Sequence, residues 1–213
     1  MSLGNGNPKE GDKGSNFNYE LKVLQGLDAI ATVLENQPTI PTSLNYGLYA
    51  ATDNSTPINN TLTPGSLLGT GVGTLVVPAN TFKVGDSFYL KLMGHLGCAN
   101  NAGLTINIKS NGNTLATTGA LTLAACTNKH WELNMYFTIR AIGAARTAKI
   151  MSGGSFTYTK NASDAFQGTN FTQINTTTFD TTAINTLVVE GQWLGLNAAN
   201  SIYSEIGILN KLY

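Results

Sequence analysis

Few side chains in this sequence could do chemistry, and the two histidines come first among them. His95 and His130 are the only histidines, and Asp86 and Glu132 lie near them along the chain. Such a set could bind a metal ion, because imidazole and carboxylate groups are common zinc ligands. No His, Asp or Glu pair, however, has the spacing of a metal motif, and both histidines fall on the polar side of alternating segments. We therefore expect solvent-facing strand positions, no metal site and no cofactor.

Three glutamates could in principle provide the acid and the base of glycoside hydrolysis. They are Glu132, Glu190 and Glu205, and each lies in a strand-like segment. That reaction needs two carboxylates on converging strands. Single acids on solvated strand faces are ordinary, and the sequence has neither a nucleophile elbow nor a phosphate-binding glycine loop. We expect no catalytic residues and no enzyme, with a glycan-cleaving enzyme as an alternative.

The two cysteines, Cys98 and Cys126, each stand at the end of an apolar strand-like run. Their spacing does not fit a metal motif, and buried free thiols are the usual explanation for such positions. A disulfide between them is the alternative.

Aromatic residues form a candidate ligand surface in or beside the Thr- and Asn-rich stretch 159–182. These residues are Tyr158, Phe166 and Phe171. In a long polar loop, rings can stack on sugars while amides bond to sugar hydroxyls. The alternative is a loop that packs on its own domain or on a neighbouring subunit, and this is the more common situation.

The composition argues against two kinds of partner. Charged residues make up only 11% of the chain, against about 25% in an average soluble protein, and 12 basic residues balance 12 acidic ones. Only Arg140 and Arg146 are arginines, so we expect no nucleic-acid binding. No apolar run approaches the ~20 residues of a membrane helix, and the N-terminus lacks a secretion-signal pattern. A near-neutral chain with few charges favours self-association.

Residues 1–38 are expected to form a flexible arm followed by one short amphipathic helix. Residues 1–18 are rich in Gly and Asn, whereas residues 20–35 have a period of 3.6 and end before Pro38. The apolar stripe consists of Val23, Leu24, Leu27, Ile30, Ala31 and Leu34. A helix this short is marginal in water, so partners must cover its stripe. Spacings of 3 and 4 within the stripe suit a coiled-coil trimer or an anchor.

The remainder predicts antiparallel β-structure, with a linker over 39–67 and a head domain over 68–213. Residues 130–140 alternate strictly between apolar and polar side chains, which is typical of a strand with one wet face. Similar runs and intervening turns predict about eight to ten strands, arranged as a β-sandwich of the jelly-roll, TNF-like kind.

The last strand is apolar on both faces. Ile208 is among its apolar residues, and the candidate contact residues are Ile202, Tyr203, Ile206, Leu209 and Leu212. A strand buried on both sides lies either in the centre of a sheet or against another subunit. We favour the subunit contact.

Several local strings resemble one group of proteins. They are GTGVGTLVVPANTFKVGDSFYLKLMGHLGCANN, NKHWELNMYFTIRAIG, GGSFTYTKN and NSIYSEIGILNKLY. These strings resemble tailed-bacteriophage virion proteins with a C-terminal jelly-roll domain, and residues 6–31 look like an N-terminal segment that phages attach to varied domains. The resemblance implies a structural or adhesive role without a catalytic motif, and fibres and head decorations of this kind are typically trimers.

Together these features predict a homotrimeric fibre or head-decoration protein on the phage virion. The N-terminus would attach to other virion proteins, and the head would bind a host-surface glycan. We favour this host-binding fibre over a capsid cement protein without receptor binding. A lectin-like or TNF-like cellular binding module is the further alternative, although it would be expected to carry a secretion signal or disulfides.

Overall fold

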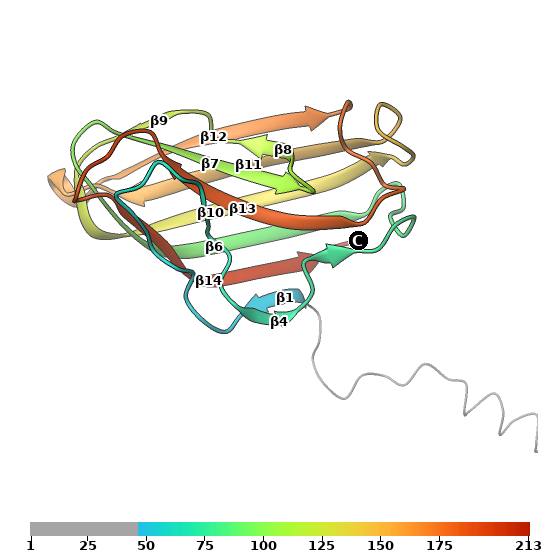
Figure 1. Cartoon of the computed structure of the whole chain (residues 1–213), viewed down its shortest axis with the longest axis horizontal. Coiled ribbons are helices and arrows are strands. Elements are labelled where there is room, and N and C mark those ends of the chain that lie inside the picture. Colours follow the sequence, from blue (N-terminus) through green and yellow to red (C-terminus); the bar gives the residue numbers. More distant parts are fainter. Residues whose placement is uncertain (1–46) are drawn as a thin grey trace, which may run out of the picture. The chain divides into compact units, whose positions relative to one another are not determined.

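The computed structural model describes residues 47–213, which form an all-β fold in which every strand pairing is antiparallel (Figure 1). The larger sheet has the order β12 (Phe166–Asn175), β11 (Lys149–Thr159), β10 (Cys126–Ala141), β6 (Ser87–Cys98), β14 (Ser201–Lys211), β1 (Gly47–Ala51) and β4 (Gly71–Gly73), with β2 (Ile58–Asn59) beside β14. The second sheet has the order β3 (Gly65–Ser66), β13 (Asn185–Trp193), β7 (Ala102–Ser110) and β8 (Asn113–Thr117), with β5 (Val76–Val77) beside β13 and β9 (Leu121–Leu123) beside β7. Within residues 47–213 the only helical segment is η1 (Ala162–Asp164).

The two sheets enclose one hydrophobic core, as the alternation of side chains predicts. Along β10 the residues from Trp131 to Ile139 alternate between buried and less buried, and the apolar ones face inward. β6 and β7 follow the same period, so Leu92 of one sheet and Ile106 of the other are fully buried in the same cluster. The prediction of an all-β, antiparallel fold is confirmed.

The chain passes repeatedly from one sheet to the other. It starts in the larger sheet at β1 and β2, enters the second sheet at β3, returns for β4, and enters the second sheet again at β5. It then forms β6 in the larger sheet and β7, β8 and β9 in the second sheet. It then returns at β10, and the strands β11 and β12 widen the larger sheet before β13 and β14 complete the two layers. As a consequence, strands distant in sequence lie side by side, as β14 does between β6 and β1 (Figure 1).

The β-structure begins before residue 68, within the segment predicted to be a linker. Three strands between residues 47 and 66 join the sheets: β1 pairs with β14, β2 pairs with β14, and β3 pairs with β13. They span two to five residues each. Strands this short, set among Pro, Thr and Asn, leave no readable alternation, which is why the sequence suggested a linker. The predicted helix and its stripe, Val23, Leu24, Leu27, Ile30, Ala31 and Leu34, lie outside the described residues.

The stretch 159–182 is also different from the prediction of a long polar loop. Ten of its residues form β12, which pairs with β11 along its whole length at the edge of the larger sheet. Residues 177–180, in contrast, form no strand. Most side chains of β12 are polar on both faces, so its composition resembles that of a loop, and only the pairing with β11 identifies it as a strand.

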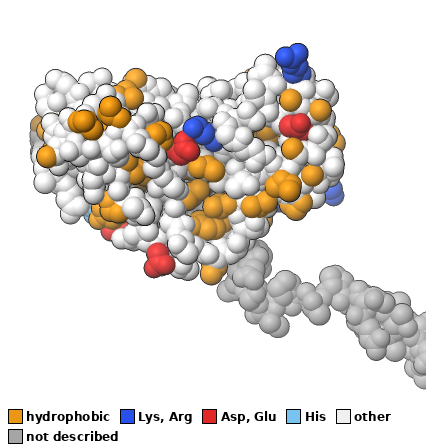
Figure 2. Space-filling view, in the orientation of Figure 1, with side chains coloured by type: hydrophobic (Ala, Val, Ile, Leu, Met, Phe, Trp, Pro, Cys, Tyr) orange, Lys and Arg blue, Asp and Glu red, His pale blue; other side chains and the backbone are white. Residues whose placement is uncertain are grey.

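The surface carries few charges. White atoms, which represent uncharged polar side chains and backbone, cover most of the face drawn in Figure 2, and the charged side chains are scattered. In the part of the chain from residue 47 onward, no helix has the length and apolar character needed to cross a membrane.

Candidate functional site

A pocket of about 240 Å³ opens at one end of the larger sheet, where β6 ends and β10 and β14 begin. We call it the end pocket. Its ring-bearing residues are His95 of β6 and Tyr203 of β14. Its polar residues are Thr127 and Asn128 of β10 and Ser201 of β14. Three strands that lie far apart in the sequence therefore contribute to one small concave surface.

A break in the β-ladder creates this pocket. The pairing of β10 with β6 shifts register between Cys126 and Lys129, and Asn128, inside the shift, has a positive φ of 49°. Extra residues of this kind bend a strand and redirect its side chains, commonly at sheet edges and near functional sites. Gly97 lies opposite, and a Cβ there would be 3.3 Å from the carbonyl oxygen of Ala199. The bulge and the close approach of the two backbones shape the pocket.

The two rings of the end pocket are held from beneath by the core. His95 and Tyr203 face each other across the β6–β14 ladder, with ring centres 5.9 Å apart and an angle of 31° between the planes. The indole Nε1 of buried Trp131 donates to the backbone carbonyls of both, at 3.1 Å and 3.0 Å. The Nδ1 atom of His95 lies 3.1 Å from a carboxylate oxygen of Glu205. The ring pair therefore has a fixed position at the surface.

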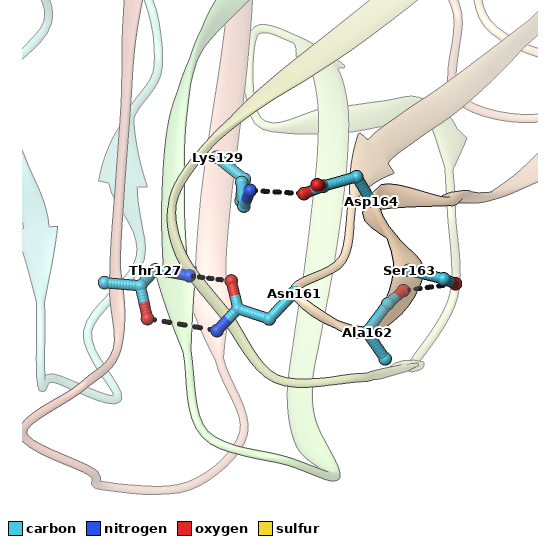
Figure 3. Close-up of polar contacts among 6 residues, drawn as sticks. All are labelled: Thr127, Lys129, Asn161, Ala162, Ser163 and Asp164. Carbon is cyan, nitrogen blue, oxygen red and sulfur yellow. Dashed lines mark hydrogen bonds and ion pairs between the residues drawn. The ribbon is translucent and has the colours of Figure 1, made fainter.

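A polar turn adjoins the end pocket through Thr127 (Figure 3). The backbone N–H of Thr127 donates to Oδ1 of Asn161 at 3.0 Å, and Nδ2 of Asn161 donates to the Thr127 hydroxyl at 3.2 Å. Lys129 pairs with Asp164 at 2.5 Å. Because the Asp164 side chain is 73% exposed, this ion pair contributes little stability. It adds exposed polar groups beside the pocket.

The predicted aromatic ligand set is separated by the structure. Phe166 is 78% exposed and follows the polar turn directly, whereas Phe171 is half-buried and packs against the core. Tyr158 is only 1% exposed, so the prediction of a surface position for it is wrong. It occupies the inward phase of β11, its hydroxyl donates to Gln167 at 2.7 Å, and burial raises its pKa to about 12.

The predicted subunit-contact set divides in the same way. Ile202 and Leu209 are buried in the protein's own core, so they are unavailable to a partner. The strand is central, between β6 and β1, which accounts for burial that the sequence attributed to a neighbour. Tyr203 lines the end pocket, and Ile206 is 49% exposed because a register shift between Ser204 and Ile206 turns it outward. Leu212 is 57% exposed beyond the end of the strand.

The acidic residues considered for catalysis each have a basic neighbour. Glu132 lies 3.4 Å from Lys91, Glu190 lies 2.5 Å from Lys109, and Glu205 contacts His95. Glu190 belongs to the second sheet, whereas the other two belong to the larger sheet. A hydrogen bond from the Asn134 amide, followed by the charge of Lys91, holds the pKa of Glu132 below its ordinary value.

The histidines and Asp86 do not form a cluster with metal-binding geometry. His130 stands opposite His95 in the ladder, but Asp86 pairs with Lys211 at 2.8 Å, at the other end of β6. Among residues 47–213, no group of three or more His, Cys, Asp or Glu side chains comes close enough together to hold a metal ion.

A second cavity, of about 340 Å³, lies at the opposite end of the sandwich. Its walls are mainly apolar and include the rings of Phe82, Phe88 and Phe179. The rings of Phe82 and Phe88 meet edge to face, with their centres 6.0 Å apart. The ion pair of Asp86 with Lys211 lies on its wall. A cavity with so few free polar groups is less suited to a hydroxyl-rich ligand than the end pocket is.

Sequence reasoning missed Thr127 and Asn128 as members of a site. A bulge in a strand leaves no reliable mark on an alternation pattern, although an Asn in the left-handed region is a common device at such positions. Tyr203 was singled out, but as a subunit contact rather than as a pocket residue.

The comparisons with known proteins give no family for this chain. No protein-family model matches the sequence, and no curated protein matches it. One solved structure with a distant likeness is the CBM2 module of the evolved Dit of Lactobacillus casei BL23 phage J-1, with a TM-score of 0.28 and 13% sequence identity. The match covers 63% of this chain and 66% of that chain. A likeness this weak identifies neither a fold nor a function.

Proposed function

We propose that this chain is a structural protein of a bacteriophage virion whose β-sandwich is exposed on the particle and binds a host-surface glycan in the end pocket. The observation that carries the glycan proposal is the end pocket itself, with the His95 and Tyr203 rings beside Thr127, Asn128 and Ser201. Rings stack on the apolar faces of sugars, and amides and hydroxyls bond to sugar hydroxyls. At about 240 Å³ the pocket has room for a single sugar unit.

The fold proposed for the head is a jelly roll. Eight main strands support it, in the orders β10-β6-β14-β1 and β3-β13-β7-β8. In each order the first of these strands along the chain lies beside the last, and the last lies beside a strand from the middle, as in two interlocking Greek keys. The hairpin partners β11 and β12 are then an addition at one edge. This fold is suited to display on a particle, but a fold alone does not identify a ligand.

The assembly proposed for the virion rests on the sequence. The local strings resemble phage virion proteins, the low charge favours self-association, and the stripe of residues 23–34 needs partners. We propose a homotrimer attached to the particle by its N-terminal segment, as a fibre or a head decoration. Host attachment is favoured over a purely stabilising cement because the end pocket offers sugar-binding chemistry at the surface.

Removing either side of the pocket should weaken glycan binding. We expect Tyr203→Ala to reduce affinity about tenfold, which corresponds to ~1.4 kcal/mol. Asn128→Gly should have a similar effect, and glycine preserves the backbone at this positive φ. The measurement begins with a glycan array of neutral and acetamido oligosaccharides. Titration calorimetry of the variants against the oligosaccharide bound best then gives the affinities.

Matched variants show whether the effect belongs to the end pocket. Tyr136→Ala removes another tyrosine from the outer face of the same sheet, and Asn80→Gly removes another exposed Asn of positive φ, 61°. Neither residue lines the pocket, so both variants should bind as the wild type does. Glycan attachment is refuted if the wild-type protein binds no oligosaccharide on the array and no purified host-cell polysaccharide. That result would not affect the proposals of trimer formation and capsid attachment, which are tested by other measurements.

A second candidate function is a role in assembly, and the outer face of the larger sheet is the feature that favours it. Half-exposed or exposed apolar groups line its central strands, including Ile206 and Tyr136, which are 49% and 56% exposed. The ring of Tyr136 lies 5.0 Å from that of Tyr89, and the Tyr89 hydroxyl donates to Asn134 at 2.6 Å. This face could pack against other copies of the chain, and a cement protein would use such a contact without any receptor.

A charge placed on this face should disrupt the trimer. We expect Ile206→Asp to shift the full-length protein from trimer toward monomer at micromolar concentration, because a carboxylate is costly to bury without a partner. Ile174→Asp is the matched control, since Ile174 is 52% exposed on the edge strand β12. Multi-angle light scattering measures the mass of each. Equal masses for the two variants and the wild type would remove this face from the assembly.

A further inference from the structure

Two thiols meet across the ladder at the base of the end pocket. Cys98 is the last residue of β6 and Cys126 is the first of β10, and the two stand directly opposite each other in the register. Their sulfur atoms are 3.5 Å apart. Both residues are buried, with exposed fractions of 3% and 2%, and both are free thiols in this structure. The only other contacts of hydrogen-bonding length for these sulfurs are with the backbone carbonyls of Ala124 and Leu96.

We propose that Cys98 and Cys126 form a reversible disulfide when the protein meets oxidising surroundings. A disulfide has an S–S distance of about 2.05 Å, so the sulfurs must approach by about 1.5 Å from their present separation. Directly opposite residues of an antiparallel pair have Cβ atoms about 4.5–5.5 Å apart, close to the range that a disulfide accepts. The register shift that begins at Cys126 leaves this end of β10 able to adjust.

The end pocket gives a reagent access to the pair, because Cys126 lines it. The chemistry is thiol–disulfide exchange with a small disulfide. One protein thiol loses its proton and attacks the reagent, forming a mixed disulfide and expelling one small thiolate. The second protein thiol then loses its proton and attacks the protein sulfur of the mixed disulfide, which forms the Cys98–Cys126 bond and expels the other small thiolate. Two protein thiols are oxidised to one disulfide, and the reagent is reduced to two thiols.

The bridge would fasten β6 to β10 beside the residues Thr127 and Asn128. It joins positions 28 residues apart, which restricts the unfolded chain, and we expect the melting temperature to rise by about 5–10 °C. Cytosolic thiols are kept reduced, whereas disulfides persist outside the cell. If the chain is the virion protein proposed above, the head would assemble reduced and become bridged after release. The bridging chemistry itself does not depend on glycan binding.

The test uses the full-length protein and bis(2-hydroxyethyl) disulfide as the oxidant. After incubation, the protein is denatured, its free thiols are alkylated, and the peptides are identified by mass spectrometry. We expect both thiols to disappear and one peptide pair linked through Cys98 and Cys126 to appear. We also expect the melting temperature to rise and to return to its starting value after treatment with a phosphine reductant. Because thiol chemistry is the readout, a failure here is distinct from a failure to bind glycan.

Single-cysteine variants supply the controls. Cys98→Ser and Cys126→Ser each retain one thiol, so each should stop at a mixed disulfide and show no reversible gain in melting temperature. If either variant folds poorly, the wild-type peptide analysis still decides the matter. The proposal is overturned if both thiols of the folded wild-type protein remain alkylatable under conditions that oxidise the unfolded chain. It is equally overturned if each cysteine carries a mixed disulfide and no linked pair forms.

Discussion

Replacing Trp131 by alanine should lower the free energy of unfolding by about 3–5 kcal/mol. The side chain is fully buried, and its ring centre lies 5.9 Å from that of Phe156 in the core. Its Nε1 atom also donates to the backbone carbonyls of His95 and Tyr203. Alanine would leave a cavity and two buried acceptors without this donor, and each of these changes is destabilising. Chemical denaturation followed by circular dichroism measures the change.

Two milder variants distinguish the contribution of Trp131 to the stability of the protein from its effect on the position of the His95 and Tyr203 rings. Trp131→Phe keeps most of the packing and removes the hydrogen bonds beneath the end pocket. Trp193→Phe is the matched control: Trp193 is also fully buried, and its Nε1 donates to the carbonyl of Ile58 at 2.9 Å. Both variants should lose about 1–3 kcal/mol, and only the first should weaken glycan binding while the protein is folded. If Trp131→Ala is no more destabilised than Tyr136→Ala, the proposed role of Trp131 is wrong.

The second large effect is expected from Gly94→Ala. Gly94 lies in β6 opposite Ser204 of β14. A Cβ at this position would lie 2.6 Å from the Cα of Ser204, and nearer still to the carbonyl oxygen of Tyr203. Because these are backbone atoms, no side-chain rotation relieves the overlap, and β6 must move away from β14. We expect a loss of about 3 kcal/mol in the free energy of unfolding, at the upper end of ordinary overpacking.

Gly195→Ala is the control for this variant. A Cβ at Gly195 has no atom within 4 Å, and the residue lies in the connection between β13 and β14. Its stability should change by less than about 0.5 kcal/mol, as for other surface positions. The comparison uses thermal unfolding and urea denaturation of both variants. Equal stability of the two would show that β6 and β14 do not approach as closely at Gly94 as the structure indicates.

The core strands were predictable because one face of each is buried and the other is not. The apolar residues of β10 from Trp131 to Ile139 were assigned to the interior from alternation alone, and they are buried. Alternation was not applied to Tyr158, which lies on the inward face of β11. It was predicted to be at the surface because a polar stretch follows it in the sequence. Alternation failed for β12, because an edge strand with mostly polar side chains on both faces has little contrast between inside and outside.

The end pocket was beyond prediction for a different reason. It depends on which strands are neighbours and on where the ladder breaks. His95, Thr127 and Tyr203 come together because β6 pairs with both β10 and β14, and strand order is a property of the whole chain. The register shift after Cys126 determines where Thr127 and Asn128 lie. A shift of one residue exchanges the two faces of a strand, and nothing in the local sequence signals it.

The sequence by itself determined the all-β class, the inward face of the central strands and the near-neutral surface that argues against nucleic-acid binding. These properties follow from side-chain types and their spacing along a single strand. Only the tertiary structure decided that the last strand is central in the larger sheet, that the two cysteines are in contact, and that two rings and a polar bulge form a pocket. Those features arise from pairings between distant segments, whose free energies depend on the assembled sheets.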